Sequence, residues 1–136
     1  MQTRPILVAA DVRVLMQAAR AEAERRGFEV SIAVVDHAGV LLALDRLDGA
    51  RLHTPEAAWL KARTAAIVRS PTAVLQDQVK GNPALLAFPG RLPLAGGVPL
   101  LYREMVVGGV GSSGGSPEDD ETLCATVLSA LAGLYP

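Results

Sequence analysis

The sequence predicts an α+β fold in which helices pack on an antiparallel sheet. Strand-like segments come in adjacent pairs, Val30–Val35 with Val40–Leu44 and Val98–Tyr102 with Met105–Val110, and each pair is joined by a connection too short for parallel pairing. Segments with helical spacing occupy both ends of the chain. The expected order is therefore α-β-β-α-α-loop-β-β-α, with at most one short strand in the loop, near Leu85.

The first half of the chain carries clear helix and turn signals. Apolar residues at helical spacing predict a helix over about Val8–Arg26, which Gly27 can end in the left-handed conformation. Asp36 and Gly39 suit the first and fourth positions of a type I turn between the first two strands. A second helix is expected over about Pro55–Val68, with Thr54 as the N-cap and a proline at its first position.

The second half repeats this chemistry. Ser70-Pro71 ends the second helix and starts a third, which runs to about Val79. Lys80–Gly97 is rich in proline and glycine and is expected to be a long loop, of a kind that is often functional. Ser116, followed by proline and by Asp119, predicts a capping box at the start of a last helix over about Pro117–Leu134.

Composition limits the classes of function. A chain of 136 residues with 50% hydrophobic residues fits one globular domain over 1–136. A net charge of −1 lacks the basic excess of nucleic-acid-binding proteins. One cysteine, Cys124, excludes an internal disulfide and suits a reducing compartment, and no apolar stretch is long enough to cross a bilayer or to form a signal peptide. We expect a cytoplasmic protein that binds neither nucleic acid nor membrane.

The first strand pair is apolar at nearly every position instead of alternating. Both faces of its sheet are therefore expected to be covered. A partner subunit is as economical a cover as the helices of one chain, so we predict a homo-oligomer.

Gly109–Gly114 formally matches the dinucleotide fingerprint G-x-G-x-x-G. That fingerprint requires a second parallel strand and a later acidic residue, and only one helix follows here. A tight strand exit that glycine permits, or an anion held at the next helix, explains the glycines better. Ser113 also fits a nucleophile elbow, but no histidine follows it.

The two histidines and Lys61 are the individual residues of interest. His37 is expected to be an exposed turn residue, whereas His53 lies at a helix mouth near Arg46 and Asp48, where an imidazole can move protons or bind a ligand. Lys61 is either an exposed lysine or a cation in a pocket wall. Two histidines without a metal-ligand motif predict no metal site. Cys124 is expected to be a small buried hydrophobe.

Five motifs along the chain resemble the GlcG/HbpS family of haem-degrading or haem-binding domains, which includes the C-terminal domain of PduO. The motifs are Val34-Val35-Asp36 through Gly39, Arg46–Ala50, Ala58 with Lys61–Ala65, Gly96–Leu100, and Val107–Gly114 followed by Asp120-Glu121. The resemblance implies a profilin-like or PAS-like fold with a five-stranded antiparallel sheet, assembly into oligomers, and haem or corrinoid binding in some members. His37, Tyr102-Arg103-Glu104 and Ser112 depart from the family pattern, and residues 76–93 resemble it least and could set ligand choice.

The resemblance leaves two function classes. We favour a small-molecule-binding protein that takes haem or another flat ligand with carboxylates, with no cofactor required, because no nucleophile and base can be paired in the sequence. The expected ligand-binding residues are Arg46, His53, Lys61, Gly96, Gly97, Gly111 and Ser112. The alternative is a cofactor-independent isomerase, lyase or hydrolase acting on a small carboxylate or a biosynthetic intermediate. Its catalytic residues would be His53, Lys61, Asp48 and Glu121.

Overall fold

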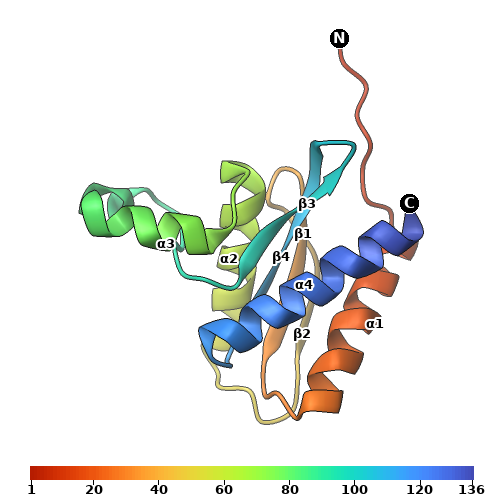
Figure 1. Cartoon of the computed structure of the whole chain (residues 1–136), viewed down its shortest axis with the longest axis horizontal. Coiled ribbons are helices and arrows are strands. Elements are labelled where there is room, and N and C mark those ends of the chain that lie inside the picture. Colours follow the sequence, from red (N-terminus) through yellow and green to blue (C-terminus); the bar gives the residue numbers. More distant parts are fainter.

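The computed structural model describes residues 1–136 and arranges them in three layers, with a sheet between two layers of helices (Figure 1). The helices are α1 (Ala9–Arg26), α2 (Thr54–Val68), α3 (Thr72–Gly81) and α4 (Pro117–Leu134), with a 3-10 helix η1 (Pro83–Ala87). The strands are β1 (Ser31–Asp36), β2 (Leu41–Arg46), β3 (Gly97–Tyr102) and β4 (Met105–Ser113). No helix is long and apolar enough to cross a membrane.

The four strands form one sheet in the order β2-β1-β4-β3, with every neighbouring pair antiparallel. The predicted α+β class is confirmed, but the expectation of five strands is wrong. The segment around Leu85 forms η1 instead of a strand. Pro83 has no N–H to give to a sheet, and the N–H of Leu85 donates locally to the carbonyl of Asn82.

The register defines two ends of the sheet. Ser31 pairs with Arg46 on one side and with Ser113 on the other, which places the entry to α2 and the start of α4 at one end, the lower end in Figure 1. The β1–β2 turn, the β3–β4 turn and the last residues of α2 and α4 gather at the opposite, upper end. Segments far apart in the chain therefore meet at each end.

Local signals were confirmed at the Asp36 turn and at the start of α4 but not at the starts of α2 and α3, since Pro71 and not Ser70 is the N-cap of α3 and no side chain caps it. The carboxylate of Asp36 accepts the backbone N–H groups of Ala38 and Val40, as the turn requires. Ser116 accepts the N–H of Asp119, whose carboxylate accepts the N–H of Ser116 in return. The assignment of Thr54 as an N-cap was wrong, because its hydroxyl donates to the carbonyl of Arg51 and contacts Ser31 inside the protein.

Two cores of different character lie on the two faces of the sheet. Large side chains such as Leu15, Ile32 and Leu123 fill the space between the sheet and α1 with α4. The opposite face, under α2, is filled by small residues, which are Ala33, Val35, Ala58, Ala62 and Ala66. Small residues let the backbone of α2 lie close against the sheet.

The glycines of β4 explain how close this approach is. A Cβ added to Gly111 would lie 2.1 Å from the carbonyl oxygen of Ala58, and one added to Gly109 would lie 2.3 Å from that of Ala62. Both glycines therefore face the backbone of α2 where no side chain fits. The glycine-rich sequence serves close helix–sheet packing, in agreement with its interpretation as something other than a dinucleotide fingerprint.

Candidate functional site

Lys61 is neither exposed nor in a pocket wall. Its side chain is 6% exposed, and its ammonium donates to the carbonyl oxygen of Ser112 at 3.0 Å and to the carboxylate of Asp120 at 3.4 Å. Asp120 also accepts the hydroxyl of Ser112 and the N–H of Gly115. This buried cluster joins α2, β4 and α4.

Burial raises the pKa of the Asp120 carboxyl above its ordinary value, against the opposing effects of Lys61, Gly115 and Ser112. The cluster is thus a charged pair held in a poorly solvated place. Lys61 has a carboxylate partner at hand and is sealed from solvent, so it does not reach a substrate in this arrangement.

The glycines predicted to bind ligand surround the same cluster. A Cβ on Gly96 would lie 3.0 Å from the ammonium of Lys61, and one on Gly97 would lie 2.5 Å from the carbonyl oxygen of Lys61. Gly111 and Ser112 belong to the neighbouring stretch of β4 and are buried. The structure therefore brings Lys61, Gly96, Gly97, Gly111 and Ser112 together, as packed neighbours of α2.

The other predicted residues lie on the surface at the lower end. Arg46, Asp48 and His53 are exposed around the entry to α2. No hydrogen bond joins His53 to Asp48 or to Glu121, which is exposed on α4. None of the five principal hollows is lined by any residue predicted to bind ligand or to catalyse. A role for these surface residues in binding or catalysis stays a prediction.

Sequence reasoning missed Asp120 because it named the adjacent Glu121. Helical spacing could have identified Asp120, because it lies on the same face of α4 as Cys124, Val127 and Leu131, which form the buried stripe of that helix. Cys124 itself is buried as predicted, and its thiol donates to the carbonyl of Gly96.

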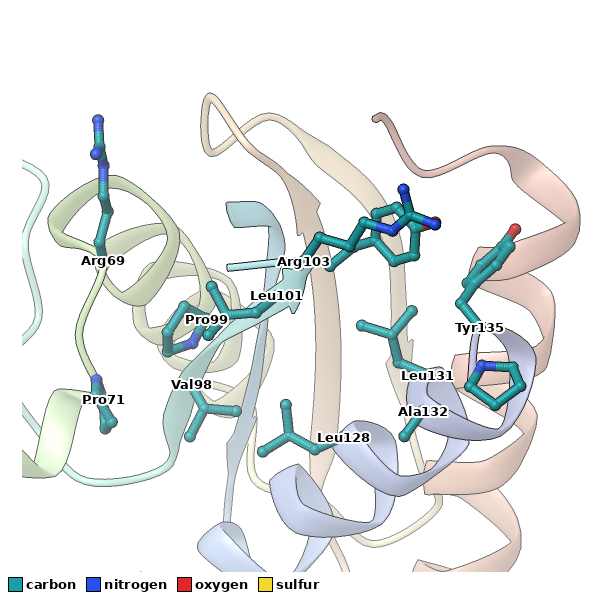
Figure 2. Close-up of a pocket in the computed structure, with 12 residues that line it drawn as sticks. Arg69, Pro71, Val98, Pro99, Leu101, Arg103, Leu128, Leu131, Ala132 and Tyr135 are labelled. Carbon is teal, nitrogen blue, oxygen red and sulfur yellow. The ribbon is translucent and has the colours of Figure 1, made fainter. Parts of the chain in front are cut away.

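The largest hollow lies at the upper end, between β3 and α4, and measures about 600 Å³ (Figure 2). We call it the β3–α4 groove. Its apolar walls come from β3 and from the last two turns of α4, and two arginines, Arg69 and Arg103, stand at its rim.

A second hollow at the upper end, of about 500 Å³, lies beside the β1–β2 turn, and we call it the His37 hollow. It is lined by Gln2, Arg4, His37, Ala38, Ala66, Ile67, Arg69, Glu104, Met105 and Val106. His37 was predicted to be exposed, but it is half-buried, and its Nδ1 is buried without any hydrogen-bond partner. Residues of the β3–β4 turn and of the N-terminal segment line the same hollow as this histidine, and nothing in the local sequence predicts that they do.

Comparison with known proteins assigns the family. A family model described as "Haem degrading protein HbpS-like" matches residues 7–129. The chain belongs to this HbpS-like family. The family resemblance drawn from the sequence motifs is thereby confirmed.

Proteins similar to this HbpS-like chain resemble it in both sequence and fold. Protein GlcG of Escherichia coli K12 is 38% identical over 117 residues, which cover 83% of this chain and 85% of GlcG. The crystal structure of protein ORFY from Klebsiella pneumoniae is 25% identical with a TM-score of 0.94, over 99% of this chain and 97% of ORFY. The crystal structure of a PduOC:heme complex is 29% identical with a TM-score of 0.86, over 93% and 95% of the two chains.

The HbpS-like family raises the question of whether this chain's residues fit haem. A haem site needs an axial donor, apolar walls and cations for the carboxylates. The β3–α4 groove offers only the tyrosines Tyr102 and Tyr135 as donors, and the hydrogen bond from Tyr135 to Asp11 raises its pKa, which disfavours a phenolate. The His37 hollow supplies an imidazole and the thioether of Met105. The residues present fit haem in the His37 hollow and not in the groove.

Proposed function

We propose that this protein binds a flat, carboxylate-bearing small molecule of the haem type in the His37 hollow. The observation that carries the proposal is the unpartnered imidazole of His37 at the edge of a hollow of about 500 Å³. A buried polar atom without a partner costs about 1–3 kcal/mol, which a bond to a ligand would offset. Because Nδ1 of His37 makes no hydrogen bond in the protein, it is available to a ligand.

Charge in the hollow suits carboxylates. Arg4 and Arg69 line it, and neither guanidinium has a carboxylate within ion-pair distance. Arg4 is held in place because it donates to the carbonyl of Val106. Glu104 is the one acid among the lining residues, which leaves a net positive lining to receive two carboxylates.

Apolar contacts complete the site. Ala66, Ile67, Val106 and Met105 provide the walls that a flat macrocycle requires. Haem bound there would supply an iron centre, and His37 is the residue whose imidazole would hold it. The HbpS-like family description and the PduOC:heme complex support the ligand class, and the geometry of this chain supports the location.

The test is a titration with haemin, followed in the Soret band, and the chain offers a matched control because it has two histidines. The wild-type protein should give a saturable Soret shift. His37→Ala should weaken haemin binding about ten-fold or more and change the spectrum, whereas His53→Ala should leave both unchanged.

Each alternative result has a clear meaning. No saturable shift with the wild-type protein would overturn the proposed function. A loss in His53→Ala but not in His37→Ala would instead place the ligand at the lower end, with Arg46 and His53. Equal behaviour of both variants would remove histidine from the site.

We also propose that the protein is a homo-oligomer. β2 is an edge strand, and Leu41, Leu42 and Leu44 on it are each about 40% exposed. An apolar edge strand that is open to water favours pairing with another copy of the chain.

The single cysteine, buried and unbridged, supports the further proposal of a cytoplasmic location.

A further inference from the structure

The β3–α4 groove runs along the edge strand β3, shares Arg69 with the His37 hollow, and has the composition of a second ligand site. Its floor and walls are apolar: Val98, Pro99 and Leu101 come from β3, and Leu128, Leu131 and Ala132 come from α4 (Figure 2). Leu101 is 50% exposed and Leu128 is 38% exposed, so a ligand that covers them removes apolar surface from water. The volume of about 600 Å³ lies within the range of small-molecule sites.

The rim of the groove is cationic. Figure 2 shows Arg69 and Arg103 on either side of Pro99 and Leu101, with the exposed side chain of Arg69 extended away from the groove and that of Arg103 directed toward the side of Tyr135. Neither arginine has a carboxylate within ion-pair distance, and no aspartate or glutamate lines the groove. Two unpaired guanidinium groups on either side of an apolar floor are complementary to an anion at each end of an apolar molecule.

Both arginines lie at positions with a left-handed backbone, at the end of α2 and in the β3–β4 turn. Arg69 has a φ of 61° and Arg103 a φ of 48°, the left-handed region that non-glycine residues rarely adopt. Glu104 is the one other non-glycine residue with positive φ. The positive φ of Arg69 belongs to the left-handed C-cap of α2, and Arg103 and Glu104 are the two residues of the β3–β4 turn.

Aromatic contacts fix the far wall. The guanidinium of Arg103 lies 5.1 Å from the centre of the Tyr102 ring, and Tyr102 packs edge-on against Tyr135 at 5.6 Å. Tyr135 is anchored in turn because its hydroxyl donates to the carboxylate of Asp11. This chain of contacts places the guanidinium of Arg103 over the Tyr102 ring, beside the apolar wall of the groove.

We propose that the β3–α4 groove binds an elongated dicarboxylate with an apolar middle section. The middle section covers Leu101 and Leu128, and the two carboxylates pair with Arg69 and Arg103. An extended peptide is a poorer occupant, because Pro99 has no N–H and the edge strand cannot offer a continuous set of donors.

Arg69 lines both hollows, so the groove shares one cation with the haem-type site and the two ligands would compete for it. Arg103 and Leu128 line the groove alone and are therefore the residues to change. Asparagine is the replacement of choice for Arg103, because asparagine tolerates the left-handed backbone better than other side chains. Leu128→Glu places a carboxylate in the groove on a solvent-facing position of α4.

The experiment is calorimetric titration with octanedioate as the probe and with octanoate and octanediol as controls. Octanedioate should bind saturably, octanoate about ten-fold more weakly, and octanediol not measurably. Arg103→Asn should weaken octanedioate binding about ten-fold and Leu128→Glu should abolish it. Arg51→Asn removes an exposed arginine at the lower end and should have no effect.

Failure would be unambiguous. Absence of saturable octanedioate binding, equal binding of octanedioate and octanoate, or indifference to both Arg103→Asn and Leu128→Glu would each overturn the dicarboxylate site. Haemin titration of Arg103→Asn should match the wild-type protein. A loss of haemin binding in that variant would show that haemin occupies the groove, which overturns the separation of the two sites.

Discussion

The ammonium of Lys61 lies 3.4 Å from the carboxylate of Asp120, and both side chains are about 95% buried, with 6% and 5% exposed. This pair links α2, on one face of the sheet, to α4, on the other. Lys61 also donates to the carbonyl of Ser112 in β4, between the two helices. Lys61, one of the four residues expected to be catalytic, is therefore part of the interior. The contribution of the pair is to the stability and alignment of the layers.

Removing one member of the Lys61–Asp120 pair should destabilise the protein strongly, whereas removing both members together should not. Lys61→Met or Asp120→Asn leaves one polar partner buried without its counterpart, and each should lower the free energy of unfolding by about 3–5 kcal/mol. The double variant should lose clearly less than the sum of the single losses. Urea unfolding of the four proteins measures this coupling, and strictly additive losses would contradict it.

Asp120 should also give the protein a specific pH dependence. Because burial raises its pKa, the folded state holds this proton more tightly than the unfolded state does. Its contribution to stability is thus present at low pH and lost as the pH rises through the folded-state pKa. Relative to Asp120→Asn, the wild-type free energy of unfolding should fall as the pH is raised from about 4. A relative gain over that range would show the opposite sign.

Gly111 should tolerate no side chain. A Cβ there would meet the carbonyl oxygen of Ala58 at 2.1 Å, so Gly111→Ala must push α2 away from β4. We expect a loss of about 3 kcal/mol in the free energy of unfolding. Gly133→Ala is the matched control, because nothing lies within 4 Å of the added carbon, and alanine favours the helix. Thermal unfolding of both variants checks the contrast.

Cys124 should be inert in the folded protein. Burial raises the pKa of its thiol to about 12, so at pH 8 about one molecule in ten thousand carries a thiolate. A chromogenic thiol reagent should react with it only after denaturant unfolds the chain. Rapid reaction under native conditions would mean that α4 opens readily from the sheet.

The leucines of β2 should hold copies of the chain together. Leu41→Lys combined with Leu44→Lys places charges on the exposed edge strand and should convert the oligomer to a monomer. Light scattering after gel filtration measures the mass. Val74→Lys, on the exposed side of α3, is the control and should leave the mass unchanged.

Sequence patterns predicted the local structure well because local chemistry controls it. The last helix was predicted over Pro117–Leu134 and is observed there, since its serine cap and Asp119 satisfy one another within four residues. The Asp36 turn follows from the bonds of one carboxylate to its own neighbouring backbone. The segment near Leu85 was misjudged because its apolar residues resemble a strand, whereas its proline prevents sheet pairing.

The environments of individual side chains could not be predicted from the local sequence. His37 and His53 are both polar residues beside turns in the sequence, and only the packing of the N-terminal segment and the β3–β4 turn makes His37 the one that lines a hollow. Arg69 and Arg103 are 34 positions apart in the chain and meet at one groove because the end of α2 and the β3–β4 turn share the upper end of the sheet.

The order of the main helices and strands, the Asp36 turn, the Ser116 cap, the α+β class and membership of the HbpS-like family were therefore contained in the sequence alone, since spacing and turn chemistry act over a few residues. Whether Lys61 faces water or Asp120, and which hollows carry cations, was decided by tertiary structure. Those outcomes depend on which distant segments exclude water from a side chain, and no local pattern encodes that.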